Sequence, residues 1–547
     1  MLACPLLTAT ARANVYATDV KLNGSRSLVT TNAAGLLTIT YILNEPATLG
    51  VAINITSGTN LIRTISAGAG ANGTLRGLNL VRWDGYDSNT NPVPLGNYLI
   101  SITASASGYT NWTQISLDAN AANHVYNPRG VAVDNNSNSL FYGRVFIGSA
   151  GTGQFPATIP GDNDTILKLN ADGTFADDGP DGNGGFDGIY DDGQSDVPQK
   201  LRVADDDRLY MMDLTGFGEV VAFDMALSTN QVVLDEETNY LGNPFYGILT
   251  QGDGSGWFSM DITGAGTTNG LVWLGDVDAG GAGVWNWHLI NGVADTNDDS
   301  GNWAVAVGGS LSVAASGGLM VDTNLDIFVG QNLTASAETN PACMDFTNWN
   351  HGLAFDGSAV TNSTVWTAGS GDNTFLGVYD TTIDSRQSPK YVACALTGGS
   401  VTNGIRILNA VTGTTNVANL DPTNQYYATG WDNAGNLYAV TGSAHLLRVY
   451  SPPSGTNQAT TVAAIHVAEG IIAIADNHTN VTITLVASET NTVADFSFVS
   501  APVISGPFET VTNAVITQAN GNPFVFTFTA PVNGPTQFYE ILPASGP

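Results

Sequence analysis

The sequence has few positive charges, and this scarcity excludes two classes of partner. Its 547 residues include 16 Lys and Arg against 48 Asp and Glu, a formal net charge of −32. Binding to nucleic-acid phosphates or to an anionic membrane surface needs a basic surface, which so few cations do not supply. We therefore expect neither nucleic acid nor a membrane surface among the partners of this protein.

Motifs for catalysis and for common cofactors are also missing. The six histidines show no HExxH or paired spacing, the cysteines form no CxxC, and no Walker, GxSxG or GxGxxG motif stands between a strand and a helix. No apolar run reaches the roughly 18 residues that a membrane-spanning helix needs. These absences disfavour zinc, c-type haem and nucleotide chemistry, and no membrane span is predicted.

The first thirteen residues, MLACPLLTATARA, are similar to the end of a signal peptide. Cleavage after Ala13, at a small-x-small site, would leave Asn14 as the mature terminus, although the basic region of a signal peptide is missing. A lipoprotein box ending at Cys4 and an unprocessed terminus are the alternatives. Charged residues make up 12% of the chain, and a polar surface of Asn, Thr, Ser and Gly is typical of extracellular sheet proteins. We expect a secreted protein, extracellular or at the cell surface.

Cysteine is scarce as well, with three in the whole chain. Removal of Cys4 with the signal peptide would leave Cys343 and Cys394. Since an exported chain folds in an oxidising compartment, we expect a disulfide between them; two buried thiols are the alternative.

The chain does contain a sequence motif that is repeated six times: a short apolar run ending in Asp, a turn, and a second apolar run. The Asp residues are Asp134, Asp205, Asp261, Asp322, Asp356 and Asp432. Each copy predicts a strand, a turn capped by the Asp carboxylate, and a returning strand. The uneven spacing excludes a solenoid and suits four-stranded blades of a β-propeller. Six copies predict six blades, and we interpret the Asp residues as turn caps rather than as a catalytic ring.

Two stretches, RGVAVDNNSNSLFYGRVFIG and GWDNAGNLYAVTGSAHLLRVYSPPSG, resemble blades of NHL-type and related six-bladed propellers. The resemblance lies in the order strand, Asp-x-x-Gly-Asn-Leu-Tyr, strand, and a third strand ending in an aromatic residue. It covers about residues 113–470 and implies a propeller domain, which we place at 109–470. Residues 109–128 are expected to contribute the strand that closes the ring.

The segments on either side of the propeller also read as strands. Residues 14–108 alternate at Leu49, Val51, Ile53 and Ile55 and contain VRWDG and PLGNY, so they resemble the FlgD-type immunoglobulin-like module. Residues 471–547 contain FSFVSAPVISGPFETV and are similar to a C-terminal module of large secreted bacterial proteins. With 1–13 as the signal remnant, the predicted class is all-β: a six-bladed β-propeller flanked by two small Ig-like β-sandwiches.

The most acidic stretch, residues 161–196, predicts a structural calcium site. Asp and Asn alternate there with Gly, so that carboxylates can converge on a hard cation. The candidate ligands are Asp177, Asp178, Asp181, Asn183, Asp187, Asp191 and Asp192, with a second group at Asp295, Asn297 and Asp299. Phe186 stands where an EF-hand needs Gly, so a solvated acidic loop is the alternative reading.

Tryptophans gather in the predicted propeller, where such rings usually fill the space between blades. Exposed in a groove, they stack on sugars or peptides instead. The candidates for such a ligand platform are Trp285, Trp287, Trp303 and Trp349.

These patterns favour a non-enzymatic function: binding, adhesion or a structural role at the cell surface or in the extracellular matrix. The expected partner is a glycan, a protein, or further copies of this chain joined into a filament through exposed edges of the sandwich domains. The alternative is a calcium-dependent hydrolase or polysaccharide lyase, which the resemblance to six-bladed propellers implies because some of these carry a metal in the channel.

Overall fold

The structure is a computed structural model. It describes residues 14–24, 37–91, 93, 97–149, 165–176, 185–186, 198–212, 220–234, 257–265, 270–276, 283–294, 302–305, 318–322, 326–329, 342–345, 363–367, 378–384, 390–397, 403–413, 417–466, 470–476, 480–486, 493–502, 507–518, 525–532 and 538–543. Regular structure in these ranges is almost entirely strand, as predicted; the two helices are short 3-10 turns, η1 (Ala121–Asn123) and η2 (Val493–Asp495). Neither has the length or apolar character of a membrane-crossing helix.

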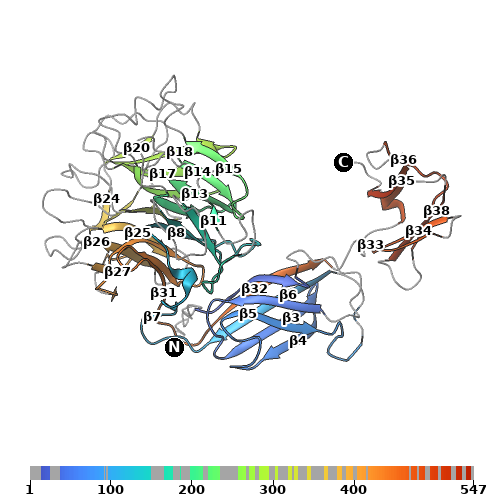
Figure 1. The fold of residues 1–547 in the computed structure, drawn as a ribbon, viewed down its shortest axis with the longest axis horizontal. Coiled ribbons are helices and arrows are strands. Elements are labelled where there is room, and N and C mark those ends of the chain that lie inside the picture. Colours follow the sequence, from blue (N-terminus) through green and yellow to red (C-terminus); the bar gives the residue numbers. More distant parts are fainter. Residues whose placement is uncertain are drawn as a thin grey trace, which may run out of the picture. The chain divides into compact units, whose positions relative to one another are not determined.

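Between residues 113 and 451 the described strands form six antiparallel sheets (Figure 1). The first three consist of β8 (Pro128–Val133), β9 (Val145–Ser149), β10 (Thr165–Leu169) and β11 (Gly185–Phe186); β12 (Lys200–Val203), β13 (Arg208–Met212), β14 (Val220–Asp224) and β15 (Asn230–Leu234); and β16 (Trp257–Thr263), β17 (Leu271–Asp276) and β18 (Gly283–Ile290), with β19 (Val293–Ala294) and β20 (Asn302–Val305) both paired to β18.

The other three sheets have the same plan of successive antiparallel strands. They consist of β21 (Leu319–Val321), β22 (Asp326–Val329), β23 (Ala342–Asp345) and β24 (Ser363–Thr367); β25 (Val378–Asp384), β26 (Tyr391–Thr397), β27 (Asn403–Asn409) and β28 (Ala418–Leu420); and β29 (Tyr426–Trp431), β30 (Leu437–Thr441), β31 (Leu446–Ser451) and β7 (Thr113–Gln114).

The first strands of these sheets form a closed ring. Each of β8, β12, β16, β21 and β25 contacts the first strand of the next sheet, and β29 contacts β8. The last sheet takes its outer strand from the beginning of the domain, because Gln114 of β7 pairs with Tyr450 of β31. The fold is therefore a β-propeller, closed by the segment that the sequence predicted.

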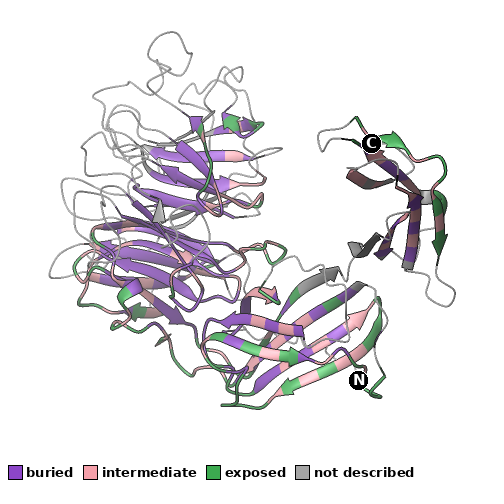
Figure 2. Cartoon of the chain, turned by 45° about the vertical axis from the view of Figure 1, so that its right-hand side comes forward, coloured by how far each residue is buried: buried purple, intermediate pink, exposed green. Residues whose placement is uncertain are grey.

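Neighbouring sheets share apolar cores, so most propeller strands are buried on both faces (Figure 2). Tyr210 of β13 and Trp287 of β18 belong to one cluster, and Val131 of β8 packs with Tyr438 of β30 in another. Burial of such side chains stabilises a fold by about 25 cal/mol for each Å² of apolar surface removed from water. These cores hold the ring, and hence the channel at its centre, in place.

Two of the repeated aspartates cap turns as predicted. Asp134 accepts a hydrogen bond from the backbone N–H of Asn136 (2.9 Å), and Asp432 accepts from those of Ala434 (2.9 Å) and Asn436 (2.8 Å). The carboxylate thus satisfies the donors of a tight turn between the first and second strands of a sheet.

A second group of strands, all but one from before the propeller, forms two sheets. One has the order β1 (Ala17–Leu22), β2 (Leu37–Leu43), β5 (Gly77–Trp83); the other has β32 (Asn457–His466), β6 (Asn97–Ala106), β3 (Gly50–Ser57), β4 (Asn60–Ala67). Trp83 and Tyr98 join the two sheets, with ring centroids 5.7 Å apart. The predicted inward alternation holds from Val51 to Ile55, whereas Leu49 precedes β3 and is exposed. Strand β32, which the sequence analysis gave to the propeller, belongs to this second sheet.

The C-terminal strands form a further pair of sheets. Their orders are β33 (Gly470–Asp476), β34 (Asn480–Val486), β38 (Val525–Pro531), β37 (Val515–Gln518), and β36 (Glu509–Thr510), β35 (Phe496–Ala501), β39 (Phe538–Pro543). Ile483, Phe498 and Phe528 lie in one buried cluster that both sheets share. This cluster is the core of the C-terminal segment.

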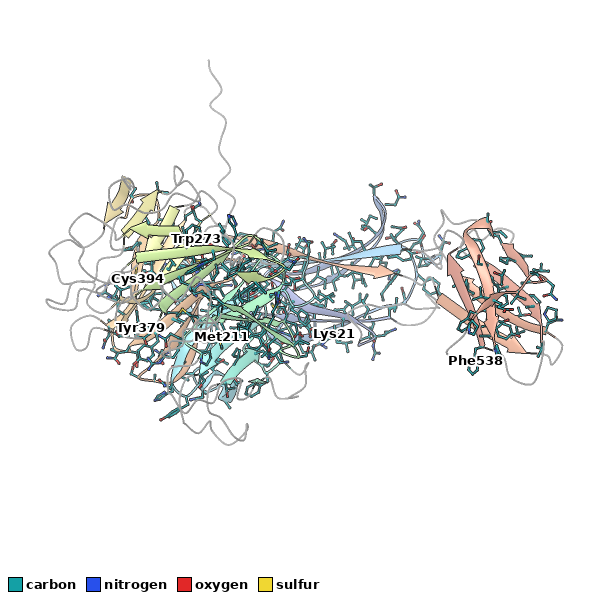
Figure 3. All side chains as sticks on the ribbon, turned by 90° about the horizontal axis from the view of Figure 1, so that it is seen from above. Lys21, Met211, Trp273, Tyr379, Cys394 and Phe538 are labelled. Carbon is teal, nitrogen blue, oxygen red and sulfur yellow. The ribbon has the colours of Figure 1, made fainter. Side chains whose placement is uncertain are left out.

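The expected disulfide is not present, because Cys394 is a free, buried thiol. Cys394 (labelled in Figure 3) lies on β26 in the fifth sheet and packs in an apolar cluster with Val392 and Leu396. Cys343 lies on β23 in the fourth sheet. Burial raises the pKa of the Cys394 thiol to about 12, which keeps it protonated and unreactive. The alternative of a buried thiol is the one that holds for Cys394.

We expect Cys394 to resist alkylation in the native protein and to react fully once the unreduced chain is unfolded. Peptide mass spectrometry after iodoacetamide treatment, with and without denaturant, measures this. Recovery of a Cys343–Cys394 disulfide peptide from the unreduced chain would contradict the expectation.

Candidate functional site

The ring of first strands encloses a cavity of about 340 Å³. It lies at the C-terminal ends of these strands, and every one of the six contributes to its wall. The wall residues at the strand ends are Val133, Val203, Ile262, Val321, Ile383 and Trp431. These side chains are apolar, so the polar groups of the pocket lie in a largely apolar wall.

Arg202 and Asp261 form a buried ion pair in the pocket lining. Arg202, on β12, is only 6% exposed, and its Nε lies 3.6 Å from Oδ1 of Asp261 on β16. Its Nη2 lies 3.5 Å from Oδ1 of Asp380 and also donates to the Leu319 carbonyl (3.3 Å). The guanidinium is thus held between two carboxylates in one orientation.

Deeper in the ring, Lys200 and Asp380 form an ion pair in which neither side chain is exposed. Nζ of Lys200 lies 3.4 Å from Oδ1 of Asp380 and donates to the carbonyls of Tyr379 (3.0 Å) and Tyr427 (3.3 Å). Asp380 also accepts from the N–H of Thr429 (2.8 Å). Burial lowers the pKa of Lys200 to about 8, against the opposing attraction of Asp380.

Side chains fill the N-terminal end of the channel. The Arg129 guanidinium lies 4.7 Å from the ring centroid of Tyr427 and donates to the hydroxyl of Tyr379 (2.8 Å). Gln199 donates to the same hydroxyl (3.0 Å), and the two tyrosine rings are 4.7 Å apart. These contacts join residues of β8, β25 and β29 across the ring.

One of the repeated aspartates differs from the turn cap predicted for it, and two others line the pocket. Asp261 lies inside β16 rather than at its end, pairs with Arg202 and accepts from the N–H of Val321 (2.7 Å). Asp322 is buried, lines the pocket and accepts from Nζ of Lys390 (3.0 Å). Asp205 is exposed and also lines the pocket, while Asp356 lies outside the described residues.

Several polar groups of the lining have hydrogen-bonding capacity left. Asn135 donates through Nδ2 to the Trp431 carbonyl (2.8 Å), but Asn135 Oδ1 and Trp431 Nε1 have no partner among the described residues. The Thr382 and Thr429 hydroxyls share one hydrogen bond (2.8 Å), which uses one of their two protons. These groups are buried beside the pocket, so their remaining hydrogen-bonding capacity is not exposed to it.

Most site residues predicted from the sequence cannot be placed here. The calcium candidates lie outside the described residues: Asp177, Asp178, Asp181, Asn183, Asp187, Asp191, Asp192, Asp295, Asn297 and Asp299. Within the described ranges, no three His, Cys, Asp or Glu side chains are grouped so as to hold a metal ion.

Of the predicted tryptophan platform, Trp287 is 1% exposed and belongs to an inter-sheet core, so that part of the prediction is wrong. The Trp287 ring packs against residues of the neighbouring sheet, so it is not accessible to a ligand. Trp285 and Trp303 pair in register across β18 and β20, and their side chains, like Trp349, lie outside what the structure describes.

The channel charges were missed at the sequence level, although a signal existed. Only 16 residues of the chain are basic, and three of them, Arg129, Lys200 and Arg202, lie on the first strands of two propeller sheets among apolar residues. Charged side chains are rarely buried without a partner, so such positions indicate an ion pair or a site.

Asp261 gives the pocket a pH dependence that can be measured. Burial raises its pKa to about 6, and Arg202 opposes this shift. Since the folded pKa exceeds that of the unfolded chain, the stability that this group contributes is present in acid and is lost as the pH rises through about 6. We expect Asp261→Asn to gain stability relative to the wild type, on the order of 2–3 kcal/mol, between about pH 4 and pH 7.

Urea unfolding of both proteins across this pH range tests the expectation. The neighbouring charges of Arg202 and Asp380 are unchanged in the variant, so the difference between the two curves reports on Asp261. Parallel pH profiles of stability would contradict it.

Comparisons with known proteins assign this chain to no family. No family model matches it, and no curated protein matches it. Solved structures with some similarity include the WD40 β-propeller domain of Doa1 (12% identity, TM-score 0.35, covering 63% of this chain and 97% of that one). Others are a Trichoderma reesei carbohydrate-active enzyme of family AA12 (11%, 0.38, 64% and 97%) and a chain of the mitotic checkpoint complex (12%, 0.38, 63% and 92%). At these scores, the assignment of a propeller rests on the ring of sheets itself.

Proposed function

We propose that this protein is a secreted, non-enzymatic binding protein of the cell surface or extracellular matrix, and that the propeller pocket holds its ligand. The observation that carries this proposal is the state of the buried charges around the pocket. Arg202 is paired with Asp261 and Asp380, and Lys200 with Asp380. Mutually neutralised groups anchored to backbone atoms favour a rigid, preformed pocket that orients a ligand.

The geometry also argues against the alternative of metal-dependent hydrolysis at this position. A catalytic calcium ion needs several carboxylates free to coordinate it. Here Asp261 and Asp322 face Arg202 and Lys390, so these carboxylates already have cationic partners. Calcium binding in the 161–196 segment, and self-assembly through the edges of the sandwich domains, stay predictions from the sequence.

A library of small neutral, cationic and anionic molecules, observed by ligand-detected NMR with the full chain, tests the proposal. We expect at least one class to bind without being converted, and Ala204→Leu to abolish binding, because Ala204 lines the cavity and a larger side chain fills it. An exposed matched control is Ala71→Leu, which lies outside the pocket lining. Binding unaffected by Ala204→Leu, no binding of any class, or conversion of a bound compound would each overturn the proposal.

A further inference from the structure

Strand β5 is the last strand of the sheet β1-β2-β5, and no strand among the described residues pairs with its outer edge. Successive side chains of a strand point to opposite faces of the sheet. Asn79 and Trp83 are buried, and the Trp83 ring meets Tyr98 of the other sheet. Leu78 and Leu80 therefore lie on the outer face, where they are 72% and 48% exposed. The edge of this sheet thus carries an exposed apolar pair.

Two other terminal strands of this sandwich are protected against further pairing. On β4, the Ile62 carbonyl accepts hydrogen bonds from the N–H (3.0 Å) and the hydroxyl (3.1 Å) of Ser88, so the chain around Ser88 lies against this strand. On β1, Asp19 has a φ of +47°, which breaks the regular strand, and its carboxylate pairs with Lys21 at 2.7 Å. Irregularities and charges of this kind keep sheets from joining edge to edge. Strand β5 has one charged residue, Arg82.

The charge of the chain restricts where two copies can meet. Residues 109–470 contain 10 Lys and Arg against 39 Asp and Glu, and residues 471–547 contain five acidic residues and no Lys or Arg. Two copies that approach through these parts repel each other. Residues 14–108 contain five Lys and Arg against four Asp and Glu. The segment that carries β5 is therefore the one without a net negative charge.

The sequence around β5 is complementary to itself in one antiparallel register. With a twofold axis at Leu80, this residue faces Leu80 of a second copy, and Leu78 faces the aliphatic stem of Arg82. Arg76, just before the strand, is then opposite Asp84, just after it, and this opposite-charge pair forms twice. An axis at Asn79 would instead set Arg76 opposite Arg82, two like charges. Charge thus favours the register centred on Leu80.

We propose that β5 is a dimerisation edge, through which two copies of this chain pair in antiparallel orientation, centred on Leu80. The two three-stranded sheets join into one sheet of six strands. Main-chain hydrogen bonds supply the affinity of such a contact, and the leucines and the charge pairs fix its register. A twofold contact uses the same surface on both copies and closes on itself, so it gives a dimer and not a filament. This surface is separate from the propeller pocket.

Sedimentation velocity of the full chain over a range of concentrations tests the proposal, at about 0.15 M salt, where charge repulsion is screened beyond about 8 Å. We expect a monomer–dimer equilibrium. Leu80→Lys sets two ammonium groups against each other at the axis and should weaken dimerisation at least about tenfold. Leu61→Lys is the matched control, because Leu61 is 59% exposed on β4. Both leucines are exposed, so neither change should lower the melting temperature.

A cross-link tests the register independently. Residues directly opposite each other in an antiparallel pair have Cα atoms about 4.5–5.5 Å apart, which is within the range of a disulfide. Mild oxidation of the Leu80→Cys variant should therefore link two copies. The Leu61→Cys variant and the wild type, which has three cysteines of its own, set the background.

Three results would each overturn the proposal. A monomer at every concentration, or a dimer that Leu80→Lys does not weaken more than Leu61→Lys does, means that β5 is not the contact. Oligomers that keep growing with concentration mean a contact that does not close. Equal cross-linking of the Leu80→Cys and Leu61→Cys variants means that Leu80 does not lie at a twofold axis.

Discussion

Replacing Asp380 by alanine is expected to lower the free energy of unfolding by about 3–5 kcal/mol, the range for removing one partner of a buried ion pair. The Asp380 carboxylate is fully buried and lies within 3.5 Å of Lys200 Nζ and Arg202 Nη2. It also accepts the N–H of Thr429. Without it, two cations on β12 stay buried with one carboxylate fewer, and a backbone donor of β29 loses its acceptor.

The effect should depend on the charge and not only on the lost volume. Lys200→Met combined with Asp380→Ala removes both members of the pair, so we expect the double variant to recover part of the stability lost in Asp380→Ala. Asp205→Ala, at an exposed position of the same pocket, is the control and should change stability by no more than about 0.5 kcal/mol. Urea denaturation measures all three; if Asp380→Ala is as mild as Asp205→Ala, the ion cluster is not a determinant of stability.

The propeller could be predicted because its signals are local. An apolar run, an Asp at the turn and a second apolar run lie within one stretch of chain, and Asp134 and Asp432 form the turns that this pattern predicts. The closing strand could be anticipated as well, because a ring needs a strand from each end of its domain. Alternation at Val481, Ile483 and Leu485 likewise predicts one buried face of the C-terminal sheet.

The pocket could not be predicted in the same way, because it is assembled from residues far apart in the sequence. Lys200 and Asp380 meet only when the second and fifth sheets face each other across the ring. The repeated motif gave a wrong prediction for Asp261, because the sequence around Asp261 has the same local pattern as the sequence around the turn cap Asp134. In Asp261 the strand continues past the aspartate, so its side chain lies along the channel instead of at a turn.

Domain boundaries and buried side chains show the same limit. Strand β32 follows the last propeller strand β31 directly in the sequence, yet it pairs with β6 from the N-terminal segment. Trp287 lies in a sequence segment rich in tryptophan, which suggested a ligand platform. Its ring is instead buried in the core between two sheets. In both cases the partner of the strand, and not the strand itself, decides the outcome.

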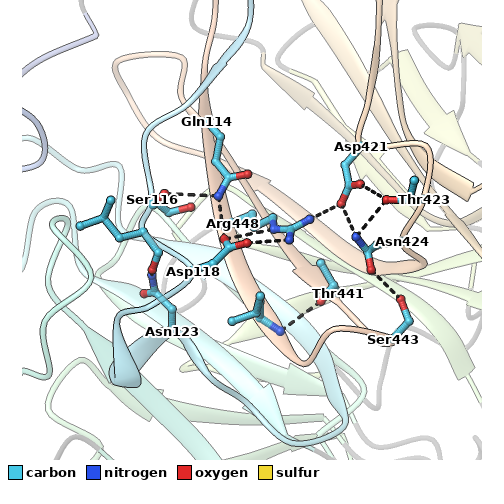
Figure 4. A network of polar contacts seen from close by, with 12 residues as sticks. Gln114, Ser116, Asp118, Asn123, Asp421, Thr423, Asn424, Thr441, Ser443 and Arg448 are labelled. Carbon is cyan, nitrogen blue, oxygen red and sulfur yellow. Dashed lines mark hydrogen bonds and ion pairs between the residues drawn. The ribbon is translucent and has the colours of Figure 1, made fainter.

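Arg448 links the closing segment of the ring to the last sheet (Figure 4). Strand β7 has two residues paired with β31, Thr113 and Gln114. Arg448, on β31, donates from Nε (3.2 Å) and Nη2 (2.7 Å) to the two oxygens of Asp118 just beyond β7, and from Nη1 to Asp421 before β29. The same bidentate contact holds the pKa of Asp118 below its usual value.

We therefore expect Arg448→Met to destabilise the propeller by about 2 kcal/mol, between the value for an exposed ion pair, about 1 kcal/mol, and that for a buried one, because Asp118 is 43% exposed. The lost contact lies where the ring closes, so protease cleavage between residues 109 and 128 should become faster than elsewhere in the chain. Arg448→Lys keeps the charge but not the bidentate geometry and should be intermediate. Arg406→Met is the matched control, because Arg406 is half-buried on β27 and donates to Asn419 of the neighbouring strand, away from the point of closure. Equal cleavage rates in the Arg448 and Arg406 variants would mean that the β7 to β31 pairing closes the ring without the ionic contact.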